Sequence, residues 1–453
     1  MKNKVIIFGT GYVAERYYNR LQNMKDKYEV TYFLDSMGKK KEFHGKSVIN
    51  PDELEKIEKN EYYYICGSDG SKNSMKNELL KKGVSESNIM VMENYSGENL
   101  YREIDDFKRV IVYPEITDLK IYNELNKKIQ YYFSNIQDVE ILYKIEDLKT
   151  DDVVLVWNHE SLCELENMGI LYSNGYKRVY CIDNSYYSGR DAHILTQLNY
   201  VKNKKYHSVS DKNLRKLEEN GYDKAFVFGA GPSLSKGIEI WKNRFNDKND
   251  LKIVCNHIYA SAKFMELIKP NIYTLVDSLY IYPEGKEFLD GIIAYVVNNN
   301  CYLVVNEYWV PLLCEKNNKL AEHIIGLSMT AKDISIPKTG CREVYYKAVD
   351  VMTSLMLPIA SALTDNIYIS GCDGYPEKNE NVQIIWEYDE SIKNTARRFR
   401  QESEKVGLDT YVDYGFTYYN HTVYLKELIE KCEQEGKRYL TLTESYIPVF
   451  KNR

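Results

Sequence analysis

Short apolar runs that alternate with helical stretches constrain the fold of this chain more than any other feature of its sequence. The first run, Val5-Ile6-Ile7-Phe8, passes through Gly9-Thr10-Gly11 into a stretch with helical character. Similar runs recur at residues 30–34 and 62–66, with a predicted helix at 51–59 between them. Strands separated by helices pair in parallel, because each crossover returns the chain in the same direction. The alternation therefore predicts an α/β fold with Rossmann-like parallel sheets.

The same alternation divides the chain into three predicted regions. A length of 453 residues exceeds one ordinary core, since domains usually contain about 100 to 200 residues. We expect a Rossmann-like domain of the nucleotide-binding type at residues 1–100, a middle α/β segment at 101–210 and a larger domain at 211–453. No Pro/Gly-rich linker separates the first two regions, so the middle segment is either a second unit or an extension of the first sheet.

The apolar runs also give the expected strands and helices. Strands are predicted in the middle segment at 109–113, 153–157 and 178–182, and in the last region at 224–228, 252–255, 272–276, 294–297, 302–305 and 367–370. Helices are predicted at 160–171, at 343–363 with an interruption at Pro358, and at 391–405, and a polar, mobile stretch at 377–390.

Charge and cysteine content exclude several classes of protein. The net charge is −6 with Lys and Asp/Glu interleaved, which disfavours a nucleic-acid partner. No uncharged stretch is long enough to cross a bilayer, and the N-terminus lacks the pattern of a secretory signal. Nine cysteines are scattered singly, which argues against a disulfide framework and a thiolate zinc site. We expect a cytoplasmic protein without a transmembrane segment, of undetermined oligomeric state.

The most informative motif is Gly229-Ala230-Gly231-Pro232-Ser233-Leu234, which follows a predicted strand and opens a helix. Gly229 and Gly231 permit a sharp turn and a close approach of the backbone to a phosphate. Pro232 suits a first helical turn, and the N–H groups around Ser233 at the positive helix end predict an anion site. The Gly-Lys-Ser/Thr ending of a Walker loop is absent. The alternative is a plain strand-to-helix turn.

Polar residues follow three other predicted strands of the last region. Asn256 could hydrogen-bond ribose or phosphate, or cap a turn. Asp277 could bind a metal or an acceptor, or cap a helix. Asp373 is placed to shape the site from the end of its strand. Because carboxyl ends of parallel strands share one edge, we expect ligands at that edge.

From residue 224 to 450 the chain resembles a superfamily of transferases. This superfamily includes the bacterial sialyltransferases of glycosyltransferase family 42, the motility-associated factor glycosyltransferases and the 6-hydroxymethylpterin diphosphokinase-like domain. Four motifs carry the resemblance in order: the loop at 229–234, Cys255-Asn256-His257, Ser370-Gly371-Cys372-Asp373, and Asn420-His421 before a helix and a final strand at 438–442.

The resemblance implies a glycosyltransferase that takes a nucleotide-activated acidic sugar, CMP-linked, to a glycan or protein acceptor. It places the donor nucleotide on the glycine loop and Asn256, and makes His421 the general base. An acceptor hydroxyl loses its proton as it attacks, and imidazole titrates near neutral pH. It implies no obligatory metal or other cofactor. One departure is that a Tyr that contacts the donor phosphate in the sialyltransferases has no clear counterpart after Thr353-Ser354-Leu355.

Two other functions stay open. One is a diphosphokinase-like enzyme that uses ATP and magnesium on a pterin-like alcohol, with Asp277 and Asp373 as candidate ligands of the ion. The other is a non-catalytic sugar-nucleotide-binding protein with a degenerate transferase domain, which the missing Tyr suggests.

The N-terminal region carries a second glycine motif. Gly9 and Gly11, followed by Ala14 and by Asp35 after the next strand, have the form of a dinucleotide fingerprint, in which the acidic residue binds ribose. The segment through residue 51 also resembles small nucleotide- or sugar-nucleotide-binding domains fused to polysaccharide-biosynthesis enzymes. We expect nucleotide binding there or, alternatively, a purely structural role.

Overall fold

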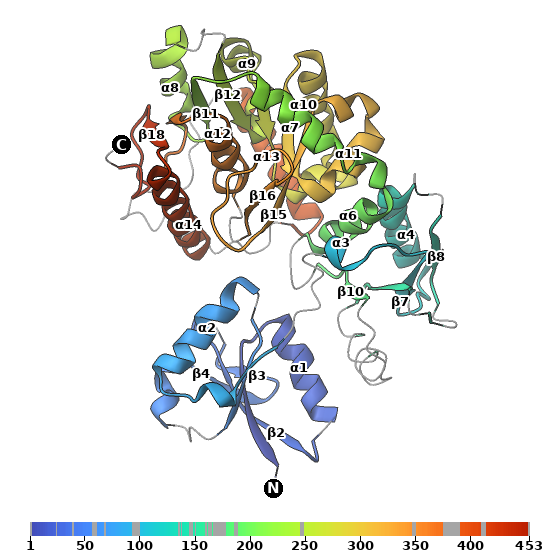
Figure 1. Cartoon of the computed structure of the whole chain (residues 1–453). Coiled ribbons are helices and arrows are strands. Elements are labelled where there is room, and N and C mark those ends of the chain that lie inside the picture. The colour runs from blue at the N-terminus through green and yellow to red at the C-terminus, as the bar shows by residue number, and fades with distance from the viewer. Residues whose placement is uncertain are drawn as a thin grey trace. The chain divides into compact units, whose positions relative to one another are not determined.

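The chain has the predicted α/β fold with Rossmann-like parallel sheets (Figure 1). The computed structural model describes residues 2–23, 25–38, 40–56, 61–67, 69–92, 100–134, 136, 138–144, 148–149, 151–158, 161, 165, 178–184, 189–244, 249–346, 350–374, 390–408 and 414–451. The chain divides into two compact units. The first comprises Met1–Glu98, Asp106–Glu124 and Asp138–Ile194, and the second comprises Asn99–Asp105, Leu125–Gln137 and Leu195–Arg453.

The first unit begins with a six-stranded sheet in the order β3-β4-β2-β1-β5-β6. Its elements are β1 (Asn3–Phe8), α1 (Tyr12–Asn23), β2 (Tyr28–Leu34), β3 (Glu42–Phe43), β4 (Lys46–Ile49), the 3₁₀ helix η1 (Pro51–Lys56), β5 (Tyr62–Ile65), α2 (Asp69–Lys81) and β6 (Ile89–Val91). Val5 and Ile7 pack with Leu21 of α1, and Ile6 packs with Leu79 of α2. Because side chains alternate across a strand, the two helices cover opposite faces of this sheet.

A four-stranded parallel sheet follows in the same unit, in the order β10-β9-β7-β8. Its strands are β7 (Arg109–Tyr113), β8 (Glu140–Leu142), β9 (Val153–Val156) and β10 (Val179–Cys181), and α4 (Leu119–Phe133) lies between the first two in sequence. The three strands predicted for the middle segment are β7, β9 and β10. Most of the helix predicted at 160–171 lies outside the described residues.

The second unit is built on an eight-stranded sheet in the order β16-β15-β14-β13-β12-β11-β17-β18, in which every neighbouring pair is parallel. The strands are β11 (Lys224–Phe228), β12 (Asp250–Cys255), β13 (Ile272–Thr274), β14 (Tyr302–Asn306), β15 (Ile324–Ala331), β16 (Glu343–Tyr345), β17 (Asn366–Ser370) and β18 (Arg438–Thr441). The helices are α3 (Leu100–Glu103), α7 (Val209–Glu219), α8 (Leu234–Trp241), α9 (Ala262–Ile268), α10 (Lys286–Asn298), α11 (Val310–Lys316), α12 (Leu357–Leu363), α13 (Glu390–Lys405) and α14 (Tyr414–Gln434), together with the part of α6 (Arg190–Lys202) from Leu195 on.

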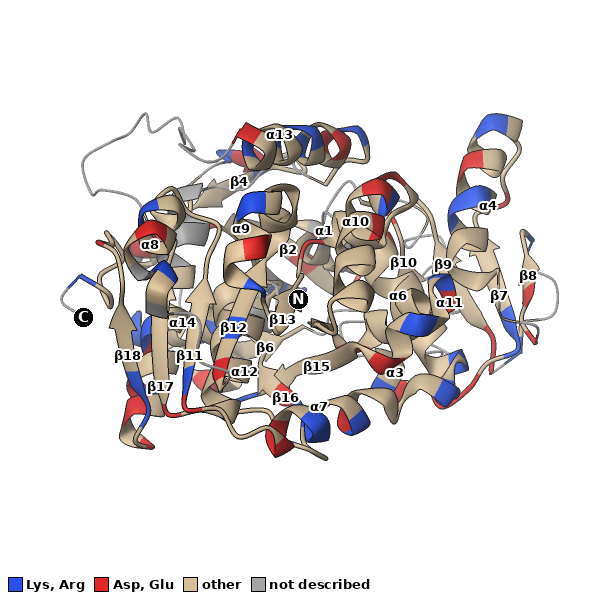
Figure 2. Ribbon diagram, turned by 90° about the horizontal axis from the view of Figure 1, so that it is seen from above, with Lys and Arg blue, Asp and Glu red and all other residues tan. Residues whose placement is uncertain are grey.

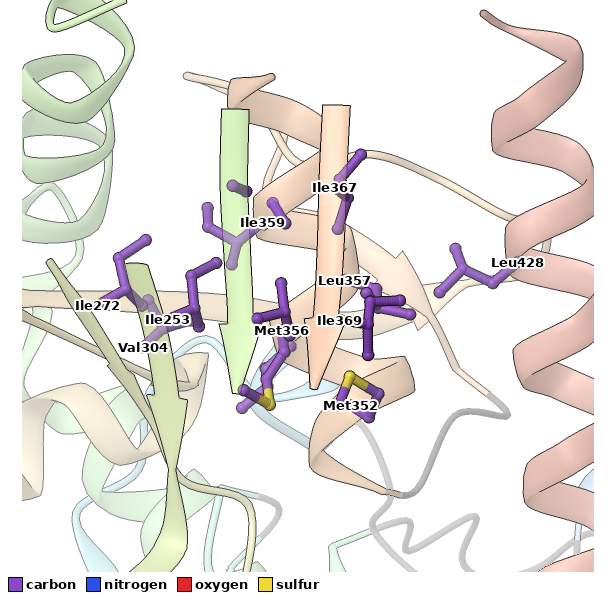
Figure 3. Close-up of a cluster of buried hydrophobic side chains, with 14 of the residues drawn as sticks. Ile253, Ile272, Val304, Met352, Met356, Leu357, Ile359, Ile367, Ile369 and Leu428 are labelled. Carbon is purple, nitrogen blue, oxygen red and sulfur yellow. The ribbon is translucent and has the colours of Figure 1, made fainter. Parts of the chain in front are cut away.

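The main core lies on one face of this sheet. Ile369 of β17 packs there with Leu357 of α12 and Leu428 of α14 (Figure 3). Val227 of β11 belongs to the same cluster. Ser370 follows Ile369 and therefore points to the other face, where its hydroxyl lies against Gly237 of α8. Helices α8 and α14 thus cover opposite faces, as in a doubly wound sheet.

Two sequence predictions for this unit differ from the structure. The strand predicted at 294–297 is wrong, because these residues end α10, whose buried positions from Phe288 to Val296 follow helical spacing. A short apolar run fits a buried helix as well as a strand. The helix predicted from residue 343 is wrong at its start: Glu343–Tyr345 is β16, and a π-helical turn, η10 (Met352–Met356), leads into α12 with Pro358 in its first turn.

Two further predictions are confirmed, and one falls almost entirely on residues that the structure does not describe. The helix predicted at 391–405 is α13, and the final strand is β18. The polar stretch at 377–390 lies outside the described residues except Glu390, which begins α13. Strand β15, which contains Gly326, was not predicted. Within the described residues every helix is too short or too polar to span a bilayer, and helices such as α13 carry both signs of charge (Figure 2).

Candidate functional site

The glycine loop at 229–233 follows β11 at the point where the strand order of the large sheet reverses. From β11 the chain proceeds to β12 on one side, whereas β17 and then β18 lie on the other side. Connections that leave in opposite directions open a crevice at the carboxyl ends of the strands, which is where open α/β sheets usually bind ligands. The loops after β11 and β17 therefore define the candidate site.

These two loops are joined by hydrogen bonds. The N–H of Gly229 donates to the carbonyl of Ser370 at 2.8 Å, and the N–H of Gly231 donates to the carbonyl of Gly371 at 2.8 Å. A Cβ on Gly229 would lie 2.6 Å from the Gly371 oxygen, and one on Gly231 would lie 2.5 Å from it. Both glycines are thus required because the loop after β17 comes so close. From the sequence, we expected these glycines to permit the close approach of a phosphate.

Asp373 lies at the start of α8. Its two carboxylate oxygens both accept the N–H of Ser233, at 3.2 Å each. A Cβ on Gly231 would stand 2.1 Å from Asp373 Oδ2, so the carboxylate covers the backbone of the loop. Burial raises the pKa of the Asp373 carboxyl, and hydrogen bonds from Ser233 partly oppose this. The carboxylate thus occupies the place where a phosphate would meet that amide.

The other N–H groups of the loop also have protein partners. Burial raises the pKa of the Cys255 thiol to about 12, and the backbone N–H of Ala230 partly opposes this rise. Leu234 donates to the carbonyl of Gly231 at 3.0 Å, and Pro232 has no N–H. The loop therefore satisfies its own donors instead of presenting them to a ligand.

Residues 443–446, which follow β18, form hydrogen bonds to the loop after β11 and to the loop after β17. The hydroxyls of Thr443 and Ser233 lie 2.9 Å apart, and the N–H of Tyr446 donates to the carbonyl of Asp373 at 2.6 Å. Ser445 donates to the carbonyl of Cys372 at 2.6 Å. Sequence reasoning missed these contacts, because no local pattern links residues 443–446 to a loop 210 positions earlier.

Asn256 adopts a left-handed backbone conformation, φ 52°, directly after β12. The buried hydroxyl of Tyr273 donates to the Asn256 carbonyl at 2.5 Å and accepts the N–H of Tyr259 at 3.1 Å. The half-buried Asn256 side chain makes no hydrogen bond to any described residue. Asn adopts this left-handed conformation more readily than most other non-glycine residues. Because β12 adjoins β11, the Asn256 amide lies beside the loop.

His257 faces protein. Its Nδ1 lies 3.3 Å from the Tyr280 hydroxyl, and its ring packs 4.6 Å from that of Phe399 on α13. Burial lowers the pKa of His257 to about 4, so the imidazole is neutral at pH 7. Helix α13 therefore docks over η5 (Asn256–Ala260), the turn that follows Asn256.

Asp277 caps the 3₁₀ helix η6 (Ser278–Ile281) by accepting the N–H of Leu279 at 3.0 Å. It follows β13, which is three strands from β17 and Asp373, or roughly 14 Å. This separation disfavours one magnesium ion bound by both carboxylates, whose oxygens lie about 2.1 Å from such an ion. Among the described residues, no three His, Cys, Asp or Glu side chains gather as metal ligands.

His421 lies half-buried on α14, with Nε2 buried and without a hydrogen-bond partner among the described residues. A helix that connects two parallel strands runs antiparallel to them. The first half of α14 therefore lies toward the carboxyl ends of β17 and β18. His421 is 13 residues before the end of α14, roughly 20 Å along its axis. α14 covers the face opposite α8, and no described hydrogen bond joins His421 to the loop.

The π-helical turn η10 packs against α14 and also approaches the loop. The methyl carbon of Met352 in η10 lies 3.2 Å from the position of a Cβ on Gly229. Asp350 caps this turn by accepting the N–H of Thr353 at 2.9 Å. π-Helical turns recur at functional sites, but the sequence around Met352 reads as an ordinary helix, so it gave no signal.

The first unit repeats the same arrangement at β1. Gly9 has φ 125°, and a Cβ on it would stand 2.4 Å from the carbonyl of Cys66 at the end of β5. The hydroxyl of Thr10 donates to Asp35 Oδ2 at 3.0 Å, and Asp35 Oδ1 accepts the N–H of Met37. Around Gly11 a Cβ would meet nothing within 4 Å. The structure thus brings the glycine motif and Asp35 together.

Residues 1–90 match the family model described as C2185-like, N-terminal. The C2185-like region contains Gly9, Gly11 and Asp35, and it ends before the second unit. No curated protein and no solved structure matches the chain. The function of the site on the large sheet must therefore be inferred from the geometry of that site.

Proposed function

We propose that the second unit is a glycosyltransferase that moves a nucleotide-activated acidic sugar, CMP-linked, to a glycan or protein acceptor. The observation that carries the proposal is the pairing of a glycine loop with Asn256 at the switch point of a parallel sheet. Among the residues that the structure describes, the side-chain amide of Asn256 has no hydrogen-bond partner, so its donors and its acceptor are available to a ligand.

In the proposed reaction His421 accepts the proton of an acceptor hydroxyl. The oxygen forms a bond to the anomeric carbon, and the bond from that carbon to the donor phosphate breaks. The electron pair leaves with the phosphate, which is already anionic and needs no acid. Because His421 Nε2 is buried in the free protein, the proposal requires that substrate binding uncovers it.

Thermal unfolding with CMP, CDP, ATP with magnesium, and NAD tests the donor class. A ligand at about 100 times its dissociation constant adds roughly 2.7 kcal/mol to the free energy of unfolding. Stabilisation by CMP or CDP without metal supports the proposal. Stabilisation by ATP with magnesium alone supports a kinase, and no response to any nucleotide supports a non-catalytic protein.

The variant His421→Ala tests the base. We expect turnover to fall by more than about tenfold while CMP affinity is unchanged, since general bases contribute about 10² to 10⁴ in rate. Parallel loss of CMP binding and turnover would make His421 a ligand or a structural residue. His323→Ala serves as the control, because His323 lies in the same sheet, directly before the start of β15.

A further inference from the structure

The position of Asp373 leaves little room for a phosphate on the glycine loop. The N–H groups of Gly229, Gly231 and Ser233 already donate to protein oxygens, one of them to the carboxylate itself. No Lys or Arg is among the groups that shift the pKa of the Asp373 carboxyl. A phosphate placed here would meet a negative charge with no described cation beside it.

A carboxylate offers about four acceptor positions. The donors that Asp373 receives come from Ser233 and from its own backbone, and the side chain is only half-buried. Acceptor capacity therefore remains at the edge of the site. Hydroxyl groups are the ligand chemistry that suits it, and an acidic residue at the end of a strand next to a glycine loop accepts ribose hydroxyls in dinucleotide-binding folds.

Asn256 supplies the second contact. It follows β12, two strands or roughly 10 Å from β17 and Asp373. A single nucleotide is long enough to extend from one to the other. Its ribose would then meet Asp373, while its base or phosphate meets the Asn256 amide, which has no hydrogen-bond partner among the described residues.

We infer that Asp373 accepts hydrogen bonds from the ribose hydroxyls of the bound nucleotide, so that the ribose and not the phosphate lies against the loop at 229–233. This inference rests on the proposed function, because it gives the orientation of the proposed donor. It predicts that the site selects ribonucleotides over deoxyribonucleotides.

The experiment compares the affinities of CMP and 2′-deoxy-CMP by calorimetry. The wild-type chain should bind CMP at least about tenfold more tightly, the usual effect of a lost hydrogen bond to a charged group. In Asp373→Asn this ratio should fall to within about twofold, since coupling disappears when one partner is removed. The Asn oxygen still accepts the Ser233 N–H, and thermal unfolding checks that the variant folds.

The matched control is Asp365→Asn, at the amino end of the same strand. Asp365 is exposed and pairs with Lys437, so its variant should keep the wild-type ratio. Equal affinities for the two ligands in the wild-type chain, or an unchanged ratio in Asp373→Asn, would overturn the inference and leave the proposed function intact. Failure of every nucleotide to bind would overturn both.

Discussion

Ser233 donates its backbone N–H to both carboxylate oxygens of Asp373, at 3.2 Å each. The two residues are 140 positions apart in sequence, yet their contact closes the switch point of the large sheet. A loop that looks like an anion site in the sequence is capped internally by an anion. The glycines around Ser233 serve this close contact first, and any nucleotide must bind around it.

The second glycines of the two motifs should therefore respond differently to substitution. In Gly231→Ala the new Cβ meets Asp373 Oδ2 and the Gly371 carbonyl, so we expect a loss of about 1–3 kcal/mol in the free energy of unfolding. Gly11→Ala meets nothing within 4 Å and should change it by less than about 0.5 kcal/mol. Denaturant unfolding measures both. Equal losses in the two variants would contradict this assignment.

Asn256 separates backbone strain from ligand binding. Asn256→Gly keeps the left-handed conformation but removes the amide, so it should weaken nucleotide binding while the fold stays stable. Asn256→Ala should weaken binding equally and cost about 1–2 kcal/mol more stability, because Ala is strained at φ 52°. Calorimetry and denaturant unfolding give the two quantities. Unchanged affinity in both variants would remove Asn256 from the site.

Arg342 is expected to be a major stabilising residue of the second unit. Its guanidinium is 10% exposed and pairs with Glu307 at 2.9 Å and with Asp211 at 3.0 Å. Arg342→Met leaves the buried Glu307 carboxylate without its cation and with the Tyr200 hydroxyl as a remaining donor, which should cost about 3–5 kcal/mol in unfolding free energy. The exposed pair of Arg398 with Glu287 is the control, and Arg398→Met should have little measurable effect. A small effect of Arg342→Met would indicate that water replaces the partner.

The buried His257 predicts loss of stability in acid. Burial lowers its pKa in the folded chain to about 4, below the unfolded value of 6.5. The unfolded chain therefore gains a proton first as the pH falls, and the free energy of unfolding decreases between about pH 6.5 and 4, by roughly 2–3 kcal/mol. His257→Gln should remove this part of the pH dependence of the apparent Tm. Tyr280→Phe keeps the imidazole and should retain it.

Much of the fold could be predicted from sequence, because buried parallel strands are continuous apolar runs and the glycine motifs mark where β1 and β11 end. The same logic brought Asn256 and Asp373 to one edge of the sheet. It could not give strand order, so it grouped Asp277 with Asp373 although β12 and β11 lie between their strands. The run at 294–297 shows that a short apolar stretch does not distinguish a strand from the buried side of α10.

Long-range polar contacts also could not be predicted from the sequence. The hydroxyl of Tyr273 that fixes Asn256, and the bond between Ser233 and Asp373, depend on strands that meet only in the folded sheet. The role proposed for His421 rests on resemblance and on the course of α14, and it stays a prediction.

The central claim is that a nucleotide binds at the switch point of the large sheet, and hydrogen–deuterium exchange with and without CMP tests it most directly. We expect slower exchange on CMP addition in the peptides that contain residues 226–237, 255–260 and 370–374. The peptide that contains residues 9–14 should be unchanged. Protection confined to residues 9–14, or no protection at the three segments at saturating CMP, would contradict it.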